Sequence, residues 1–158
     1  MAVNKAKFRA DLRKHKRAGF DTSLFIYHLE DIEPYADLCE IAFGAVAGNS
    51  LQGIWSTITV TELLTKPFAH GLTEQLKGCE QFIHSFANAR LVPLDYAIAR
   101  EAGRLRGKYK LKTPDALLVA TSLKEKAGAF ITNDGGLRKL KAEGIVIMVL
   151  DDYLKTSM

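Results

Sequence analysis

Four acidic residues follow predicted strands or open predicted helices, where side chains are well placed to do chemistry. They are Asp21, Glu62, Asp115 and Asp134. Ligands of open parallel sheets bind outside the carboxyl ends of the strands, so acids at these junctions are candidates for one shared site. If neighbouring carboxylates meet about 5 Å apart, each pair of like charges costs on the order of 3 kcal/mol at an effective dielectric near 20.

A cluster of this kind must either take up protons or hold a cation. Carboxylate oxygens favour Mg²⁺ or Mn²⁺ over zinc. A bound Mg²⁺ that keeps some of its waters is suited to phosphodiester cleavage, because it activates a water and stabilises the leaving oxygen. The four acids together therefore predict a Mg²⁺ or Mn²⁺ site with this chemistry.

Each acid taken singly also has an ordinary structural explanation. Asp21 and Asp134 can cap helices, and Thr59 with Glu62 matches the capping-box pattern. Asp115 falls in the first turn of a predicted helix, where a negative charge gains about 0.3–1 kcal/mol from the helix dipole. These are the commonest uses of single acids at helix starts, so the metal site depends on the joint pattern.

The elements that must position these acids alternate along the chain. Strands are predicted to end at Phe20 and to cover 53–58, 90–92, 129–131 and 145–149. Helices are predicted over 23–30, 34–47, from Thr59 to a stop at Pro67, and over 73–88, 95–106, 114–126 and 135–142. No Asn-Gly hairpin signal joins two strands, so the order predicts an α/β fold with a mostly parallel central sheet and helices on both faces.

The composition is that of one folded domain. The chain has 158 residues, of which 47% are hydrophobic and 25% charged. Cys39 and Cys79 lie far apart without metal-ligand spacing, and we expect both to be reduced, partly buried thiols. We find neither a secretory signal nor an apolar run of about 18 residues, so we expect a soluble, cytoplasmic protein with no membrane contact.

Basic residues are concentrated in two parts of the chain. Residues 1–20 carry seven Lys or Arg against one Asp, which is +6, so the remainder sums to −2 within the total of +4. A second basic group lies just before the Asp115 segment and contains Arg104, Arg106, Lys108 and Lys110. Such patches suit a phosphate-rich partner. Solvated faces that serve only solubility are the alternative.

The segments that carry the four acids resemble the motifs of PIN domains. Phe20-Asp21-Thr22-Ser23-Leu24-Phe25-Ile26 resembles the opening of these domains, and Thr59-Val60-Thr61-Glu62-Leu63-Leu64 resembles their second motif. Thr113-Pro114-Asp115-Ala116-Leu117-Leu118-Val119-Ala120-Thr121-Ser122-Leu123 resembles VapC toxins in particular, and Ile131-Thr132-Asn133-Asp134 resembles the last motif. The resemblance runs from about residue 18 to residue 154.

This resemblance implies a PIN-like three-layer fold over residues 18–158 and a metal-dependent endoribonuclease, commonly the toxin of a type II toxin–antitoxin pair. The matching acids, Asp21, Glu62, Asp115 and Asp134, would hold Mg²⁺ or Mn²⁺ and carry the cleavage of RNA. Hydroxyl or amide groups of Thr22, Ser23, Thr132 and Asn133 would hydrogen-bond a carboxylate or a metal-bound water. A homodimer and a cognate antitoxin that fills the active-site groove are implied as well.

Two basic segments have functional interpretations that depend on where the fold places them. If Arg104, Arg106, Lys108 and Lys110 lie near the active edge of the sheet, they would contact RNA phosphates. Residues 1–17 form a basic extension that VapC-like chains usually lack, since those begin almost directly with the first strand. This segment is expected to be either a disordered extension or an added RNA-binding arm.

Other functions remain open at this stage. A haloacid-dehalogenase-type phosphohydrolase normally has Asp-x-Asp after its first strand, and Asp21-Thr22-Ser23 lacks the second acid. Response-regulator receivers pair two adjacent acids early in the chain, and none precede the first predicted helix of the core here. A non-catalytic PIN-like module that binds RNA or a protein is the third alternative.

Overall fold

The computed structural model describes residues 2–155, and its centre is a five-stranded sheet in which every neighbouring pair of strands is parallel. The strands are β1 (Arg17–Phe20), β2 (Gln52–Ser56), β3 (Ala89–Val92), β4 (Ala129–Thr132) and β5 (Val146–Val149). Their order is β3-β2-β1-β4-β5, which puts β1 in the middle. The predicted α/β fold with a parallel sheet is therefore confirmed.

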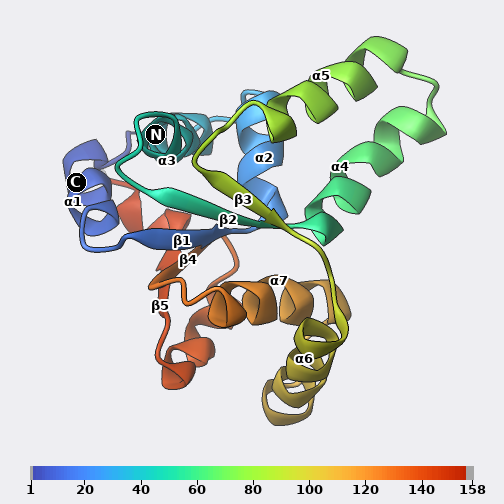
Figure 1. Cartoon of the computed structure of the whole chain (residues 1–158). Helices are drawn as coiled ribbons and strands as arrows, with labels where there is room; N and C mark the ends of the chain where they lie inside the picture. The colour runs from blue at the N-terminus through green and yellow to red at the C-terminus, as the bar shows by residue number, and fades with distance from the viewer. Residues whose placement is uncertain (1, 156–158) are drawn as a thin grey trace.

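Helices cover both faces of the sheet, as Figure 1 shows. The α-helices are α1 (Lys5–Leu12), α2 (Thr22–Leu29), α3 (Tyr35–Ala47), α4 (Thr57–Ala69), α5 (Thr73–His84), α6 (Tyr96–Tyr109) and α7 (Thr113–Lys124), and the 3-10 helices are η1 (Gly135–Glu143) and η2 (Leu150–Tyr153). Phe20 and Trp55 join the apolar cluster that contains α1, α2 and α3. Ile54 and Phe130 join the cluster beneath α6, α7 and η1. Adjacent residues of a strand, such as Ile54 and Trp55, thus pack against the helices on opposite faces of the sheet.

The region from β2 to α4 differs from the predicted boundaries. The predicted strand 53–58 ends at Ser56, because the Ser56 hydroxyl accepts a hydrogen bond from the Ile58 amide and starts α4 two residues early. Pro67 does not stop α4, which continues to Ala69. A proline removes one helical hydrogen bond, and burial of the Pro67 ring offsets part of that cost in the last turns.

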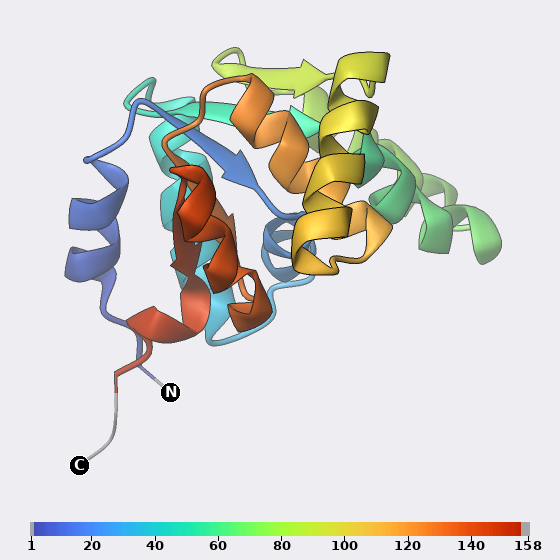
Figure 2. The same ribbon diagram turned by 90° about the horizontal axis from the view of Figure 1, so that it is seen from below.

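The basic N-terminal segment is folded over 5–12 rather than disordered. Phe8 and Leu12 of α1 are buried in the main apolar cluster, and the Phe8 ring meets the Tyr153 ring edge-on at 4.9 Å between centroids. The Asn4 amide donates to the Tyr153 carbonyl at 2.6 Å. Figure 2 shows α1 beside the C-terminal segment. The disordered alternative is therefore wrong for α1, while the proposed boundary at residue 17 stays a prediction.

Two further findings concern the thiols and the helices. Cys39 and Cys79 are buried and free, as expected from their spacing. Across residues 2–155, the helices are too short or too polar to cross a bilayer.

A glycine allows α7 to pack closely against β1. Gly19, in the middle of β1, faces the Ser122 side chain of α7, and a Cβ at Gly19 would overlap the Ser122 hydroxyl oxygen. Ser122 is held there because its hydroxyl donates to the Leu118 carbonyl at 3.2 Å. This contact fixes α7, which carries Asp115, against the strand that ends just before Asp21.

We therefore expect Gly19→Ala to destabilise the domain by about 1–3 kcal/mol, because the new methyl group must push α7 away from β1. Urea denaturation measures the change. Gly103→Ala in α6 is the matched control, since no atom lies within 4 Å of its added Cβ. That control should raise stability by about 0.5–1 kcal/mol through helix propensity. Equal stability of the wild type and Gly19→Ala would show that the packing at Gly19 is looser than described.

Candidate active site

Asp21 and Asp134 lie at the same edge of the sheet because they follow neighbouring parallel strands. Phe20 of β1 pairs with Ile131 of β4, and the Asp21 amide extends the ladder by donating to the Ile131 carbonyl at 2.9 Å. Asp134 comes two residues after β4. In Figure 1 this edge is the end of β1 that faces α2 and the start of α4. The expected placement at the carboxyl ends of the strands is observed for both acids.

The side chain of Asp21 does not cap the helix that follows it. Asp21 occupies the N-cap position of α2, yet its side chain makes no capping hydrogen bond. Its Oδ2 instead accepts a 2.6 Å hydrogen bond from the Thr132 hydroxyl. Burial is the main cause that raises the pKa of Asp21 to about 6; the charges of Asp115 and Glu62 act in the same direction, and the hydrogen bond from Thr132 opposes them. The Ser23 amide lowers the pKa only as a smaller effect, so capping of α2 is not the main role of this carboxylate.

Glu62 lies beyond the first turn of α4 and is held by threonine hydroxyls. Thr22 Oγ1 donates to Glu62 Oε1 at 2.7 Å and lies 2.9 Å from the Thr59 hydroxyl. Both threonines are buried. Since Ser56 is the cap of α4, the capping-box explanation for Thr59 and Glu62 is wrong. Thr59 was missed as a site residue, although its position one helical turn before Glu62 in the same motif was a usable signal.

Asp115 points out of the first turn of α7, and its surroundings are acidic. Burial raises the pKa of Asp115, and the charges of Asp134 and Glu62 add to the rise, while Lys112 opposes it. Lys112, the N-cap residue of α7, makes no side-chain capping bond. A first-turn carboxylate gains from the helix dipole, as expected, but that gain is opposed here by neighbouring acids.

Asp134 combines a structural role with its place in the acidic group. Its Oδ1 accepts a 2.8 Å hydrogen bond from the Gly136 amide and caps η1, so the capping explanation is correct for this oxygen. The Asp134 amide donates to Thr132 Oγ1 at 3.0 Å. Thr132 thus connects two acids, since the same hydroxyl donates to Asp21.

The four carboxylates share one region without forming a closed metal cage. Asp21 is influenced by the charges of Asp115 and Glu62, and Asp115 by those of Asp134 and Glu62. Within residues 2–155, no three His, Cys, Asp or Glu side chains lie close enough together to hold a metal ion as they stand. The predicted Mg²⁺ or Mn²⁺ site stays a prediction.

The donor chemistry nevertheless fits a divalent cation. All four acids offer hard oxygen ligands, and a buried carboxylate among other acids is stable as an anion only beside a positive charge. Ser23, two residues after Asp21, has a buried hydroxyl with no hydrogen-bond partner among the described residues. A buried hydroxyl of this kind is typical of a site completed by a water or an ion.

The family follows from a sequence comparison. The family model of the PIN domain matches residues 20–143, which includes all four acids. The chain belongs to the PIN domain family. A search of curated protein sequences finds no match.

Solved structures with the same fold include bacterial VapC proteins. VapBC2 from Rickettsia felis, bound to a DNA fragment from its promoter, is similar with a TM-score of 0.63 at 16% identity over 84% of this chain and 98% of that chain. The Mycobacterium tuberculosis toxin VapC20, which cleaves the sarcin–ricin loop, gives a TM-score of 0.63 at 14% identity over 82% and 96%. A toxin–antitoxin complex from Klebsiella pneumoniae gives 0.56 at 23% identity over 80% and 93%. At these identities the likeness shows the fold.

The predicted polar supports of this PIN domain divide into three cases. Thr22 and Thr132 contact carboxylates, as expected. Ser23 contacts no polar group among the described residues. Asn133 contacts no carboxylate: its amide nitrogen donates to the Tyr27 hydroxyl at 3.3 Å, and its oxygen accepts from the Asp151 amide at 3.0 Å. Asn133 thus spans the gap between α2 and η2 instead of contacting a carboxylate, and its contact with a metal-bound water stays a prediction.

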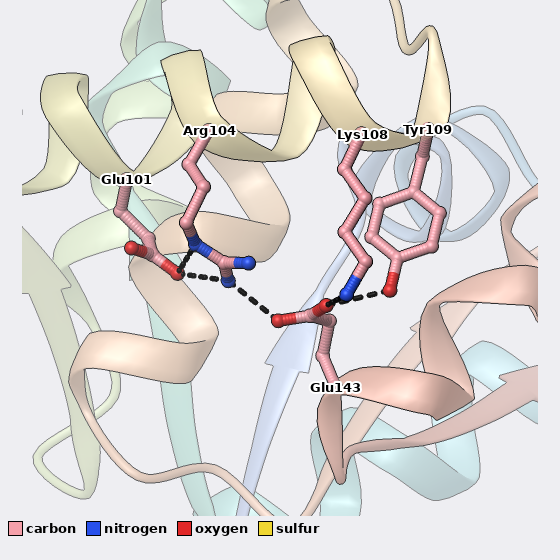
Figure 3. Close-up of polar contacts among 5 residues, drawn as sticks. All are labelled: Glu101, Arg104, Lys108, Tyr109 and Glu143. Carbon is pink, nitrogen blue, oxygen red and sulfur yellow. Dashed lines mark hydrogen bonds and ion pairs between the residues drawn. The ribbon is translucent and has the colours of Figure 1, made fainter.

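The second basic group is largely engaged in contacts within the domain. Arg104 and Lys108 form ion pairs with Glu143, which also accepts from the Tyr109 hydroxyl, as Figure 3 shows. Arg104 pairs with Glu101 as well. These contacts fasten the end of η1 to α6. We call the Arg104, Lys108, Tyr109 and Glu143 side chains the η1 clamp.

The other two members of the basic group have local roles. Arg106 donates to the Leu111 carbonyl at 3.0 Å, and Lys110 ends α6 in the left-handed conformation, with φ of 57°. RNA contact by Arg104, Arg106, Lys108 and Lys110 stays a prediction. Asp134 caps η1, and α6 leads directly into α7, which carries Asp115. By joining η1 to α6, the clamp therefore also helps to hold Asp134 and Asp115 in place.

We expect Asp21→Asn to stabilise the metal-free domain near neutral pH. The folded-state pKa of about 6 lies above the ordinary 3.8, so ionisation of Asp21 weakens folding progressively as pH rises from about 4 to above 6. The variant should exceed the wild type by on the order of 3 kcal/mol at pH 8, and the difference should vanish below pH 4. Urea denaturation in EDTA measures it. If Asp21→Asn were less stable than the wild type both at pH 8 and below pH 4, the Asp21 side chain would have a purely structural role.

Loss of the clamp carboxylate should have the opposite pH dependence. The Arg104 guanidinium, together with Tyr109 and Lys108, lowers the pKa of Glu143 to about 2. Its stabilising effect is therefore full above about pH 4.5 and is lost as pH falls towards 2. Glu143→Gln should lower the urea midpoint at pH 6 and lower it less at pH 3. Glu80→Gln, exposed on α5, is the control. A deficit that is equal at both pH values would mean that the carboxylate charge is not responsible.

Proposed function

We propose that the chain is a Mg²⁺- or Mn²⁺-dependent endoribonuclease and the toxin of a toxin–antitoxin pair. The observation that carries this proposal is the buried carboxylate of Asp21. The negative charges of Asp115 and Glu62 act on it, at the carboxyl edge of the sheet of a PIN domain. Such an arrangement is costly for folding and is explained when a cation compensates it. VapC20 from Mycobacterium tuberculosis, which has this fold and cleaves the sarcin–ricin loop, supports the choice of RNA as substrate.

A divalent ion held by Asp21, Glu62, Asp115 and Asp134 would supply the activation of water and the stabilisation of the leaving oxygen. The chain's own contribution is orientation. Thr132 fixes the Asp21 carboxylate, and Thr22 fixes that of Glu62. Because the pKa of Asp21 is about 6 without a cation, this carboxyl holds a proton part of the time in mildly acidic solution. Cation binding would release that proton, so affinity should rise with pH.

Partners belong to the same proposal. An antitoxin is proposed because two of the related structures are toxin–antitoxin or VapBC complexes. A homodimer in the cytoplasm, the compartment of the proposed RNA substrate, completes the proposal.

A second candidate function is a non-catalytic module that binds RNA or a protein. It is favoured by one observation, the lack of any three potential ligands within metal-binding distance in residues 2–155. A haloacid-dehalogenase-type activity has no comparable support, because Thr22 and Ser23 follow Asp21 where that class has a second Asp.

Cleavage of a panel of structured RNAs in EDTA, Mg²⁺ or Mn²⁺ tests the proposal. We expect cleavage that requires metal and falls by about 10³-fold or more in Asp115→Asn. Asp31→Asn is the matched control: Asp31 is exposed and has φ of 52°, a conformation that asparagine tolerates well. It should cleave like the wild type.

Either of two outcomes would contradict the nuclease. Equal cleavage by Asp115→Asn and the wild type would indicate a contaminating enzyme. RNA binding without cleavage under any metal condition would favour the non-catalytic module.

A further inference from the structure

The exposed face of α1 carries a regular row of positive charge. Lys5, Arg9 and Arg13 follow one another at intervals of four residues, so they lie along one side of the helix over about 12 Å of its axis. The opposite side carries Phe8 and Leu12, which are buried. We call the three basic residues the α1 basic row.

The α1 basic row forms one wall of a groove. The groove lies between α1 and α3, has a volume of about 530 Å³, and is lined by all three residues of the row. Gly44 and Ala45 of α3 line the other side, and the groove is open there because Gly44 has no side chain and Ala45 only a methyl group. Leu12 and Leu51 contribute apolar surface to the lining.

The charges in this groove are only partly balanced. Lys5 forms an ion pair with Asp37 at 3.6 Å, and Glu40 also lines the groove. Among residues 2–155, Arg9 and Arg13 form no ion pair, and both are exposed. Like charges at this spacing weaken an isolated helix by a few tenths of a kcal/mol. The row therefore has a small cost for folding that a bound polyanion would remove.

The groove lies away from the acidic edge. The chain passes from α1 into β1, and four residue steps along this strand place Arg17 about 13 Å from Asp21. Figures 1 and 2 show α1 at the end of the sheet away from α4 and α6. A phosphate bound in the groove is thus too far from Asp21, Asp115 and Glu62 to belong to the phosphodiester bond that is cleaved.

We propose that the groove between α1 and α3 binds the phosphate backbone of the RNA substrate at a second position, with Arg9 and Arg13 as its phosphate ligands. This proposal rests on the proposed nuclease function and adds a remote contact to it. Guanidinium groups suit phosphate oxygens because they donate two parallel hydrogen bonds. The occupant is taken to be RNA because the proposed substrate of the acidic edge is itself a polyanion, and a single file of phosphates suits a groove rather than a flat surface.

Such a contact predicts a dependence on RNA length. An RNA that covers only the cleavage site cannot reach the groove, whereas a longer RNA with the same site can. The contact should contribute to binding rather than to the chemical step, and it should be sequence-independent and sensitive to salt. Removal of residues 1–16 is not a suitable test, because it also removes Phe8 and Leu12 from the apolar core.

The test compares R9Q/R13Q with K7Q/K14Q, which removes the same charge from the N-terminal segment outside the row: Lys7 lies in α1, and Lys14 follows the helix. Cleavage is measured on a short oligonucleotide and on a long structured RNA. Binding of the long RNA is measured by fluorescence anisotropy in EDTA on an Asp115→Asn background. For the long RNA we expect R9Q/R13Q to weaken binding and raise KM about tenfold, with kcat unchanged. The slope of log Kd against log salt should fall by about 1.4, and the short oligonucleotide should be cleaved normally.

The proposal would be contradicted if K7Q/K14Q weakened binding of the long RNA as much as R9Q/R13Q, or if R9Q/R13Q left that binding unchanged. Loss of activity of R9Q/R13Q on the short oligonucleotide would also contradict it. Complete displacement of the RNA by polyglutamate at matched charge would indicate that the groove binds an acidic peptide instead. If the wild type cleaves neither RNA, the nuclease proposal fails separately. The anisotropy measurement then still decides whether the groove binds RNA.

Discussion

The close contact between β1 and α7 determines how the acidic residues meet. α7 reaches β1 only because Gly19 has no side chain at the point where Ser122 lies. Asp115 is in the first turn of α7, and Asp21 follows β1 by one residue, so this contact fixes the relation of the two carboxylates. The η1 clamp acts on the same group from the other side, because it holds the helix that Asp134 caps. The acids are thus positioned by apolar packing and by a charged clamp outside the site.

The hydrogen bonds around the acids stabilise orientation more than they reduce repulsion. Thr132 donates to Asp21 and Thr22 donates to Glu62, yet burial still holds the pKa of Asp21 near 6. Stability is therefore reduced in this region, in the way expected where a protein retains polar groups for binding or chemistry. Glu143 is the contrasting case, since Arg104, Tyr109 and Lys108 surround its carboxylate and lower its pKa.

Much of the fold could be predicted because local patterns agree with it. Strands alternate with helices without hairpin signals, and acids follow the strands, which was enough to predict the parallel sheet and the edge where Asp21 and Asp134 lie. Contacts between residues far apart in the chain could not be predicted. The pairing of Arg104 and Lys108 with Glu143 spans 39 and 35 residues, and the packing of Phe8 on Tyr153 joins the two ends of the domain. The hydrogen-bond partners of Asn133 could not be predicted for the same reason, since Tyr27 and Asp151 approach it only in the folded domain.

The central position of β1 has a consequence for the order in which the domain can be completed during synthesis. β1 is made early, but its two neighbours are β2 and β4, and β4 begins at Ala129. The Thr132 hydroxyl that holds Asp21 therefore becomes available only after most of the chain has left the ribosome. A nascent chain shorter than 132 residues lacks two members of the arrangement, Thr132 and Asp134. The acidic cluster therefore stays incomplete on the ribosome until Asp134 has been added to the chain.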